Sequence, residues 1–177
     1  MNKSLGYYQL AGYVFTSVFG TLLHFIYDWT NKSIIAGIFS AVNESIFEHM
    51  KLLYFPMLIF ALFESRVFVK DYPCFWRAKL IGFLCGLGLI PVIYYTYSGI
   101  IGKNLDWLNI LIFFIAAGVS FYIETKVMKN KDKCTKTSGF SFGLILLIGI
   151  IFIILTFLPP HIPLFIDPIT KTYGINI

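Results

Sequence analysis

Long stretches without a charged side chain dominate the chain, and short polar segments separate them. Uncharged runs cover residues 4–27, 80–102, 107–123 and 137–166. A helix needs about 20 mostly apolar residues to cross the hydrocarbon core of a bilayer. The pattern therefore predicts one membrane crossing in each run, and the pair Pro159-Pro160 is expected to end the last helix.

A further crossing is predicted around residues 46–66, although it carries more charge. Only twelve residues are uncharged between Lys51 and Glu64, which is about 18 Å of helix against a hydrocarbon core of about 30 Å. Glu48, His49 and Lys51 must therefore enter the membrane or reach its outer edge. Pro56 would kink this helix, a distortion that neighbouring helices can accommodate.

The segment before this helix has a different character. Residues 33–42 are apolar but too short to cross, so we expect a re-entrant or interfacial half-helix that turns near Asn43. The predicted fold is a single all-α polytopic transmembrane bundle of about five spans. The expected spans are residues 6–27, 46–66, 80–101, 106–124 and 139–158, followed by an outer tail at 159–177.

The composition is typical of an integral membrane protein. Hydrophobic residues make up 58% of the 177 residues and charged residues only 13%, about half the charged share of a typical soluble domain. The net charge is +5, but the basic residues gather in short loops rather than along one helix face. That distribution argues against nucleic acid as a partner.

The basic loops also predict an orientation. Lysine and arginine concentrate in residues 66–79 and 126–136, whereas the alternate loops hold few. The positive-inside rule then places the N-terminus in the cytoplasm and the C-terminus outside a multi-pass cell membrane protein. Cys74 and Cys134 would face the cytoplasm and stay reduced. With Cys85 they form an odd set without a C-x-x-C pair, so neither a disulfide framework nor a thiolate metal site is expected.

The polar residues outside the loops gather at the predicted outer face. The residues expected there are His24, Asp28, Asn43, Glu44, Glu48, His49, Lys51, His161 and Asp167. All three histidines of the chain thus fall in one layer. In addition, Ser17, Thr21, His24 and Asp28 share one helix face, and so do Ser40, Glu44, Glu48 and Lys51, because their spacings are three or four residues.

This outer set has three interpretations, which the sequence leaves open. The first is a divalent metal site such as zinc, with His24, His49 and either Glu44 or Asp28 as ligands. Glu48 would then be a candidate general base, in a metal-assisted hydrolase acting on a lipid or small amphiphile.

The second interpretation is a small transporter or channel, with Glu44, Glu48 and Lys51 lining a path. The third is a hydrated rim with no chemistry, as in an accessory subunit that only packs against other membrane proteins. Whether the chain is an enzyme, and whether it forms a homo-oligomer, is not decided by the residues.

Established catalytic motifs do not resolve the choice. The chain has no H-E-x-x-H, no G-x-S-x-G and no P-loop. Gly82 and Gly86 form a G-x-x-x-G pair, which is expected to pack helices within the chain rather than to form a dimer seam.

Three segments resemble a known family. They are Gly-Thr-Leu-Leu-His-Phe at 20–25, Asn-Glu-Ser-x-x-Glu-His-x-Lys at 43–51, and the proline-containing run at 159–168 with its Pro-Leu-Phe-x-Asp-Pro motif. Together they are similar to a family of small bacterial multipass membrane proteins that carries an unknown-function label. The resemblance runs the whole length. It implies a membrane protein and points to the same outer residues, but implies no activity.

Overall fold

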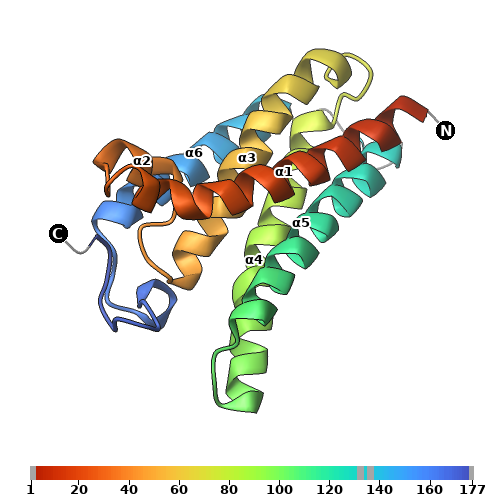
Figure 1. The fold of residues 1–177 in the computed structure, drawn as a ribbon. Coiled ribbons are helices and arrows are strands. Elements are labelled where there is room, and N and C mark those ends of the chain that lie inside the picture. The colour runs from red at the N-terminus through yellow and green to blue at the C-terminus, as the bar shows by residue number, and fades with distance from the viewer. Residues whose placement is uncertain (1–2, 131–133, 135–137, 176–177) are drawn as a thin grey trace.

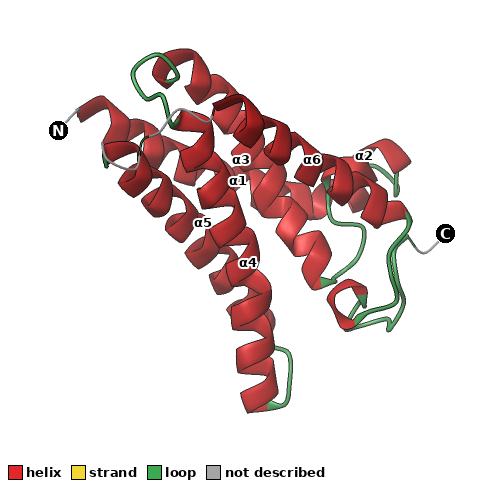
Figure 2. Ribbon diagram, turned by 180° about the vertical axis from the view of Figure 1, so that it is seen from behind, coloured by secondary structure: helices red, strands yellow, loops and turns green. Residues whose placement is uncertain are grey.

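The computed structural model describes residues 3–130, 134 and 138–175, and helices joined by short loops make up most of this part of the chain (Figures 1 and 2). The elements are α1 (Lys3–Trp29), α2 (Ile34–Phe39), α3 (Ile46–Phe68), α4 (Phe75–Ile101), α5 (Asp106–Lys129), α6 (Ser138–Phe157) and the 3-10 turn η1 (Pro163–Phe165). Five of the helices are long and apolar enough to cross a membrane. The predicted all-α bundle with five spans is therefore confirmed.

Residues 33–42 do not add a sixth crossing. They form α2, which has only six residues and lies at one end of the bundle beside α1 and α6 (Figure 1). The spanning helices α1, α4 and α5 are longer than expected, because charged residues at their ends continue the helix. Lys79 and Glu124, expected at the membrane boundary, both lie inside helices and are fully buried.

The spanning helices divide into two groups that part at one end. Helices α4 and α5 form an antiparallel hairpin, whose 102–105 loop projects away from the C-terminal tail (Figure 2). Helix α1 packs across α3 and α5, and α6 packs on α4. The ends of α1 and α3 that carry the histidines therefore lie beside the first turns of α5.

Local signals fix the helix ends on this side of the bundle. The Ser45 side chain caps α3 by accepting a hydrogen bond from the Glu48 amide at 3.4 Å. Gly102 ends α4 in the left-handed conformation, at φ 75°, which glycine adopts without a steric penalty. Helix α6 ends at Phe157, just before Pro159-Pro160, as predicted.

The glycine pair on α4 packs within the chain, as expected. A Cβ atom on Gly82 would lie 2.5 Å from Cγ of Glu124, and one on Gly86 would lie 2.0 Å from Oγ of Ser120. Both neighbours belong to α5. Because Gly82 and Gly86 have no side chains, α5 can approach α4 closely enough to bury the polar side chains of Ser120 and Glu124 against the α4 backbone.

The prediction that the cysteines stay unpaired is wrong. Cys74 and Cys134 form a disulfide bond, and Cys85 is free. The two partners are 60 residues apart in sequence, and no local motif links them. They meet because α3–α4 and α5–α6 are both connected at the same end of an antiparallel bundle.

The C-terminal tail folds back over the opposite end. The ring of Phe165 packs on Phe47 of α3 with centroids 4.3 Å apart. The Asn43 side-chain amide donates to the carbonyl of Gly174 at 3.0 Å, and its oxygen accepts from the amide of Ser45 at 2.9 Å. The tail is therefore tied to the loop that precedes α3.

Candidate metal centre

Three side chains from two helices and one loop converge near the C-terminal end of α1. Helix α1 supplies His24, the first turn of α3 supplies His49, and the loop between α2 and α3 supplies Glu44. His24 Nε2 lies 3.6 Å from Oε1 of Glu44, and His49 Nε2 lies 3.6 Å from Oε2 of the same carboxylate. Glu44 thus presents one oxygen to each imidazole.

The His49 ring is held by the backbone of its own helix. Its Nδ1 lies 2.9 Å from the carbonyl oxygen of Ser45, four residues earlier. A carbonyl can only accept, so Nδ1 is the donor in this contact, and in a neutral ring Nε2 would be the nitrogen available to a metal. Metal-binding histidines usually have this arrangement, in which a second-shell acceptor fixes the tautomer.

The three residues fit a divalent metal in number, type and spacing. One atom from each of His24, Glu44 and His49 lies within 4.8 Å of the other two. Ligands on a tetrahedral zinc at 2.0–2.1 Å are about 3.3 Å apart, so small side-chain movements would bring all three onto one ion. Two histidines and a glutamate also leave a fourth position open, as in catalytic zinc sites.

The three candidate ligands line a pocket of about 430 Å³ between α1, α3 and α5. Its other lining residues are Gly20, Thr21, Phe25, Leu52, Asp106, Asn109, Ile110, Phe113, Phe114 and Ile169. A Cβ atom on Gly20 would lie 2.5 Å from the Phe113 ring and 2.8 Å from the carbonyl oxygen of Leu52. Glycine at this position therefore allows the three helices to approach beside the histidine.

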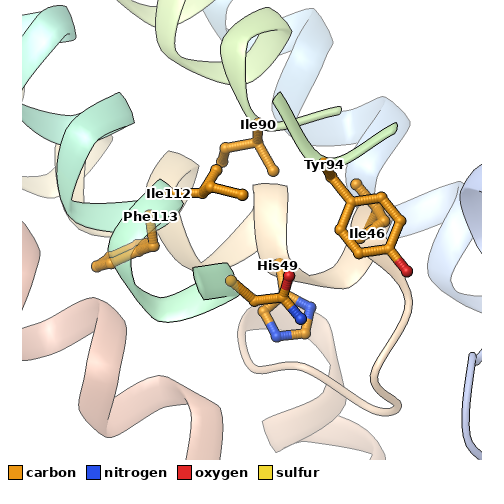
Figure 3. A pocket seen from close by; sticks show the side chains of 7 residues that line it. Ile46, His49, Ile90, Tyr94, Ile112 and Phe113 are labelled. Carbon is orange, nitrogen blue, oxygen red and sulfur yellow. The ribbon is translucent and has the colours of Figure 1, made fainter. Parts of the chain in front are cut away.

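His49 also lines a second, much smaller cavity (Figure 3). Its volume of about 20 Å³ is enough for roughly one water molecule. Tyr94, Ile90 and Ile112 face it together with His49, and Asn109 lines both cavities. His49 therefore contributes to the walls of both cavities.

Glu48, the candidate general base of the predicted metal site, does not join this cluster. Its carboxylate bonds Lys51 at 2.6 Å, accepts from the Val42 amide at 3.1 Å and accepts from the Thr156 hydroxyl at 3.1 Å. Lys51 also donates to the Gly37 carbonyl at 2.8 Å. Glu48 and Lys51 are three positions apart and so share one face of α3, whereas His49 is the residue next to Glu48. The ion pair and the histidine therefore lie on different faces of α3.

The remaining predicted residues lie around the cluster rather than in it. Asp28 is exposed, one turn beyond His24, and is not part of the group of three ligand atoms. The ring of His161 packs on Tyr173 with centroids 4.6 Å apart. The buried Asp167 accepts hydrogen bonds from the amides of Ile169 and Thr170 at 2.8 and 3.2 Å. Asn43, Asp167 and His161 therefore belong to the tail structure.

A family model described as a family of unknown function (DUF6512) matches residues 2–175. The chain belongs to this family. The comparisons with curated proteins and with solved structures gave no match. The resemblance found in the sequence is thus confirmed as membership of an uncharacterised family.

Two polar residues that line the pocket of this DUF6512 chain are not among the site residues predicted from the sequence. Asp106 and Asn109 are three residues apart and share one face of the first turn of α5. Asn109 accepts from the Tyr97 hydroxyl at 2.5 Å and donates to Asn104 at 2.8 Å. A polar i, i+3 pair at the start of an apolar helix is a sequence signal for these two residues, in addition to the position of Asp106 at the end of a predicted span.

Proposed function

We propose that this protein is a metal-dependent hydrolase of the membrane, with a divalent ion such as zinc bound by His24, Glu44 and His49. The observation that carries the proposal is the convergence of two imidazole Nε2 atoms on one carboxylate, at 3.6 Å each, in the wall of an open pocket. A zinc ion bound there would supply an activated water and polarise the substrate carbonyl.

The pocket supports an amphiphile as the substrate. Phe25, Leu52, Ile110 and Phe113 give it apolar walls, while the three metal-ligand candidates and Asp106 form its polar part. The volume of about 430 Å³ lies within the range of small-molecule sites. Phe25 and Ile110 are also 45% and 59% exposed on the spanning helices, so an acyl chain could enter from the surrounding lipid.

The reaction that fits is hydrolysis of an ester or amide near the polar head of such a molecule. Water oxygen bonds to the acyl carbon, the bond from that carbon to the leaving alcohol or amine breaks, and the leaving group departs with a proton from the water. We assign the proton transfer to Asp106, because it lines the pocket and lies outside the metal-ligand group. Glu48 is unsuitable, because Lys51, Val42 and Thr156 already occupy its carboxylate.

The same contacts argue against the second interpretation, a transporter in which Glu44, Glu48 and Lys51 line a path. Lys51 is fully buried and directed at Glu48, Gly37 and Thr156. Its charge is therefore used to hold α2 and α6 against α3, and Glu44 is separated from it.

We also propose that the metal centre faces the outside of a cell membrane, with the N-terminus in the cytoplasm. The bias of lysine and arginine toward loops 66–79 and 126–136 supports this orientation. The Cys74–Cys134 bond lies on the side that this orientation makes cytoplasmic, where thiols are normally reduced. The two signals therefore oppose each other, and the topology experiment in the Discussion decides between them.

The activity can be tested with purified protein in detergent and a panel of single-chain esters and amides of increasing acyl length. The expected result is hydrolysis that a chelator abolishes, that zinc restores, and that rises as the chain lengthens. Asp106→Asn should lower kcat while leaving metal binding intact, and Glu48→Gln should leave kcat in the folded protein unchanged. Failure of every metal-loaded preparation to cleave any member of the panel would contradict the proposed reaction.

A further inference from the structure

A second charged cluster lies inside the opposite half of the bundle, far along α1 from His24. Lys79 of α4 forms ion pairs with Glu64 of α3 and with Glu124 of α5, the latter at 2.6 Å. The side chains of all three are at most 1% exposed. Gln9 of α1, itself 5% exposed, donates from Nε2 to Oε1 of Glu64 at 2.7 Å. Four spanning helices thus meet at one polar centre.

The charges of this centre do not balance if both carboxyl groups are ionised. Among the described residues, one ammonium group then faces two carboxylates, which leaves one negative charge among side chains that are at most 1% exposed. Arg77 precedes Lys79 by two residues and so lies on roughly the opposite side of α4. Aromatic rings complete the surroundings, since Phe75 and Phe121 each have their centroid 5.4 Å from Nζ of Lys79.

Three buried oxygen atoms at this centre have no hydrogen-bond partner among the residues that the structure describes: Oε1 of Glu124, Oε1 of Gln9 and Oε2 of Glu64. The Glu64 oxygen is held by its ion pair with Lys79, whereas the Gln9 oxygen belongs to the amide that donates to Glu64. Oε1 of Glu124 lies against the α4 backbone, where a Cβ atom on Gly82 would be 2.8 Å away. The centre therefore combines unpaired acceptors on two separate helices with an excess negative charge, and one bound cation would remove the excess charge.

We propose that this centre binds one proton, which the carboxyl groups of Glu64 and Glu124 share. Like charges that share a site cannot both be held away from water at low cost, and protonation of one is the usual outcome. The protonated pair with Lys79 is neutral. A proton also needs no space, which suits a centre packed against Gly82 and two aromatic rings. Ionisable groups held inside a membrane are commonly parts of proton-handling sites.

The site is independent of the metal centre. Gly12 lies between Gln9 and His24 along α1, and a Cβ atom there would be 2.5 Å from Phe121 and 2.7 Å from Phe60. These rings therefore pack against α1 between the two centres. The bound proton is therefore expected to exchange with water at the end of the bundle that carries the α3–α4 connection.

Infrared spectroscopy of the full-length protein in detergent tests the proposal directly. The wild type at neutral pH should show the C=O stretching band of a protonated carboxyl group. Glu124→Gln leaves Lys79 with Glu64 alone, and Glu64→Gln leaves it with Glu124 alone. Each pair is neutral without a proton, so each variant should lose the band. The control Asp71→Asn, at an exposed loop residue, should keep it.

A second measurement follows proton release in place of the infrared band. Unfolding the wild type at neutral pH should release one more proton per molecule than unfolding either glutamine variant that remains folded, because the freed glutamate ionises in water. A wild type without the band, or a band that survives in both glutamine variants, would overturn the proposal. Stabilisation of the wild type by sodium ions but not by acid would also overturn it, in favour of a metal cation.

Discussion

The imidazole rings of His24 and His49 lie with their centroids 5.5 Å apart, although they belong to different spanning helices. Glu44 lies between their Nε2 atoms, and the carbonyl of Ser45 fixes the tautomer of His49. The pairing depends on the tight contact of α1 with α3 at Gly20, which brings the two rings to the same depth. The proposed metal centre depends on this contact between His24, Glu44 and His49.

Metal binding at this site should weaken as the pH falls. Both imidazoles must be neutral and Glu44 must be ionised to act as ligands, so protons compete with the metal. We expect zinc affinity, measured by competition with a chromophoric chelator, to fall steeply between about pH 8 and pH 5, the range in which histidine titrates. Affinity that stays constant over this range would show that the histidines are not ligands.

The Glu48–Lys51 pair should support stability rather than metal binding. Removing one partner leaves a buried charge without compensation, which costs about 3–5 kcal/mol. Lys51→Met should therefore lower the unfolding temperature in detergent, followed by circular dichroism, whereas the exposed control Lys103→Met should not. The folded Lys51→Met protein should bind zinc as the wild type does. A loss of zinc in this variant would place Lys51 in the site after all.

The close contact of α4 with α5 gives a test of the fold. Gly86→Ala would place a methyl group 2.0 Å from Oγ of Ser120 and 3.2 Å from the carbonyl of Ala116. We expect destabilisation of about 1–3 kcal/mol from this overpacking. Gly88→Ala is a matched control, because nothing lies within 4 Å of a Cβ atom there. Equal unfolding temperatures for the two variants would contradict the described helix contact.

The orientation can be read with an impermeant thiol reagent in intact cells. A Cys74→Ser, Cys85→Ser double variant leaves Cys134 as the single, half-exposed thiol. It should stay unlabelled if loop 126–136 is cytoplasmic. Lys103→Cys in a cysteine-free chain should be labelled, since Lys103 is exposed at the other end. The reverse pattern would invert the topology and agree with a disulfide in an oxidising compartment.

The spanning helices could be predicted from sequence because each is a long uncharged run, and such runs depend only on local composition. The sequence also predicts that His24 and His49 lie at the same membrane depth, because one ends a span and the other begins the next span on the same side. The partner of each charged side chain could not be predicted from the sequence, because it depends on how each helix is rotated about its own axis. Glu48 and His49 are adjacent in sequence but face different neighbours. The Lys79 centre and the Cys74–Cys134 bond likewise depend on contacts between distant helices.

The central claim is tested most directly by elemental analysis of the purified, full-length protein. The wild type and His161→Ala should each carry about one equivalent of a divalent transition metal, because His161 packs on Tyr173 in the tail. His24→Ala, His49→Ala and Glu44→Gln should each lose most of it, since the loss even of a second-shell partner costs about 10–100-fold in affinity. A wild type without bound metal after zinc loading, or equal metal content in all five proteins, would contradict the account.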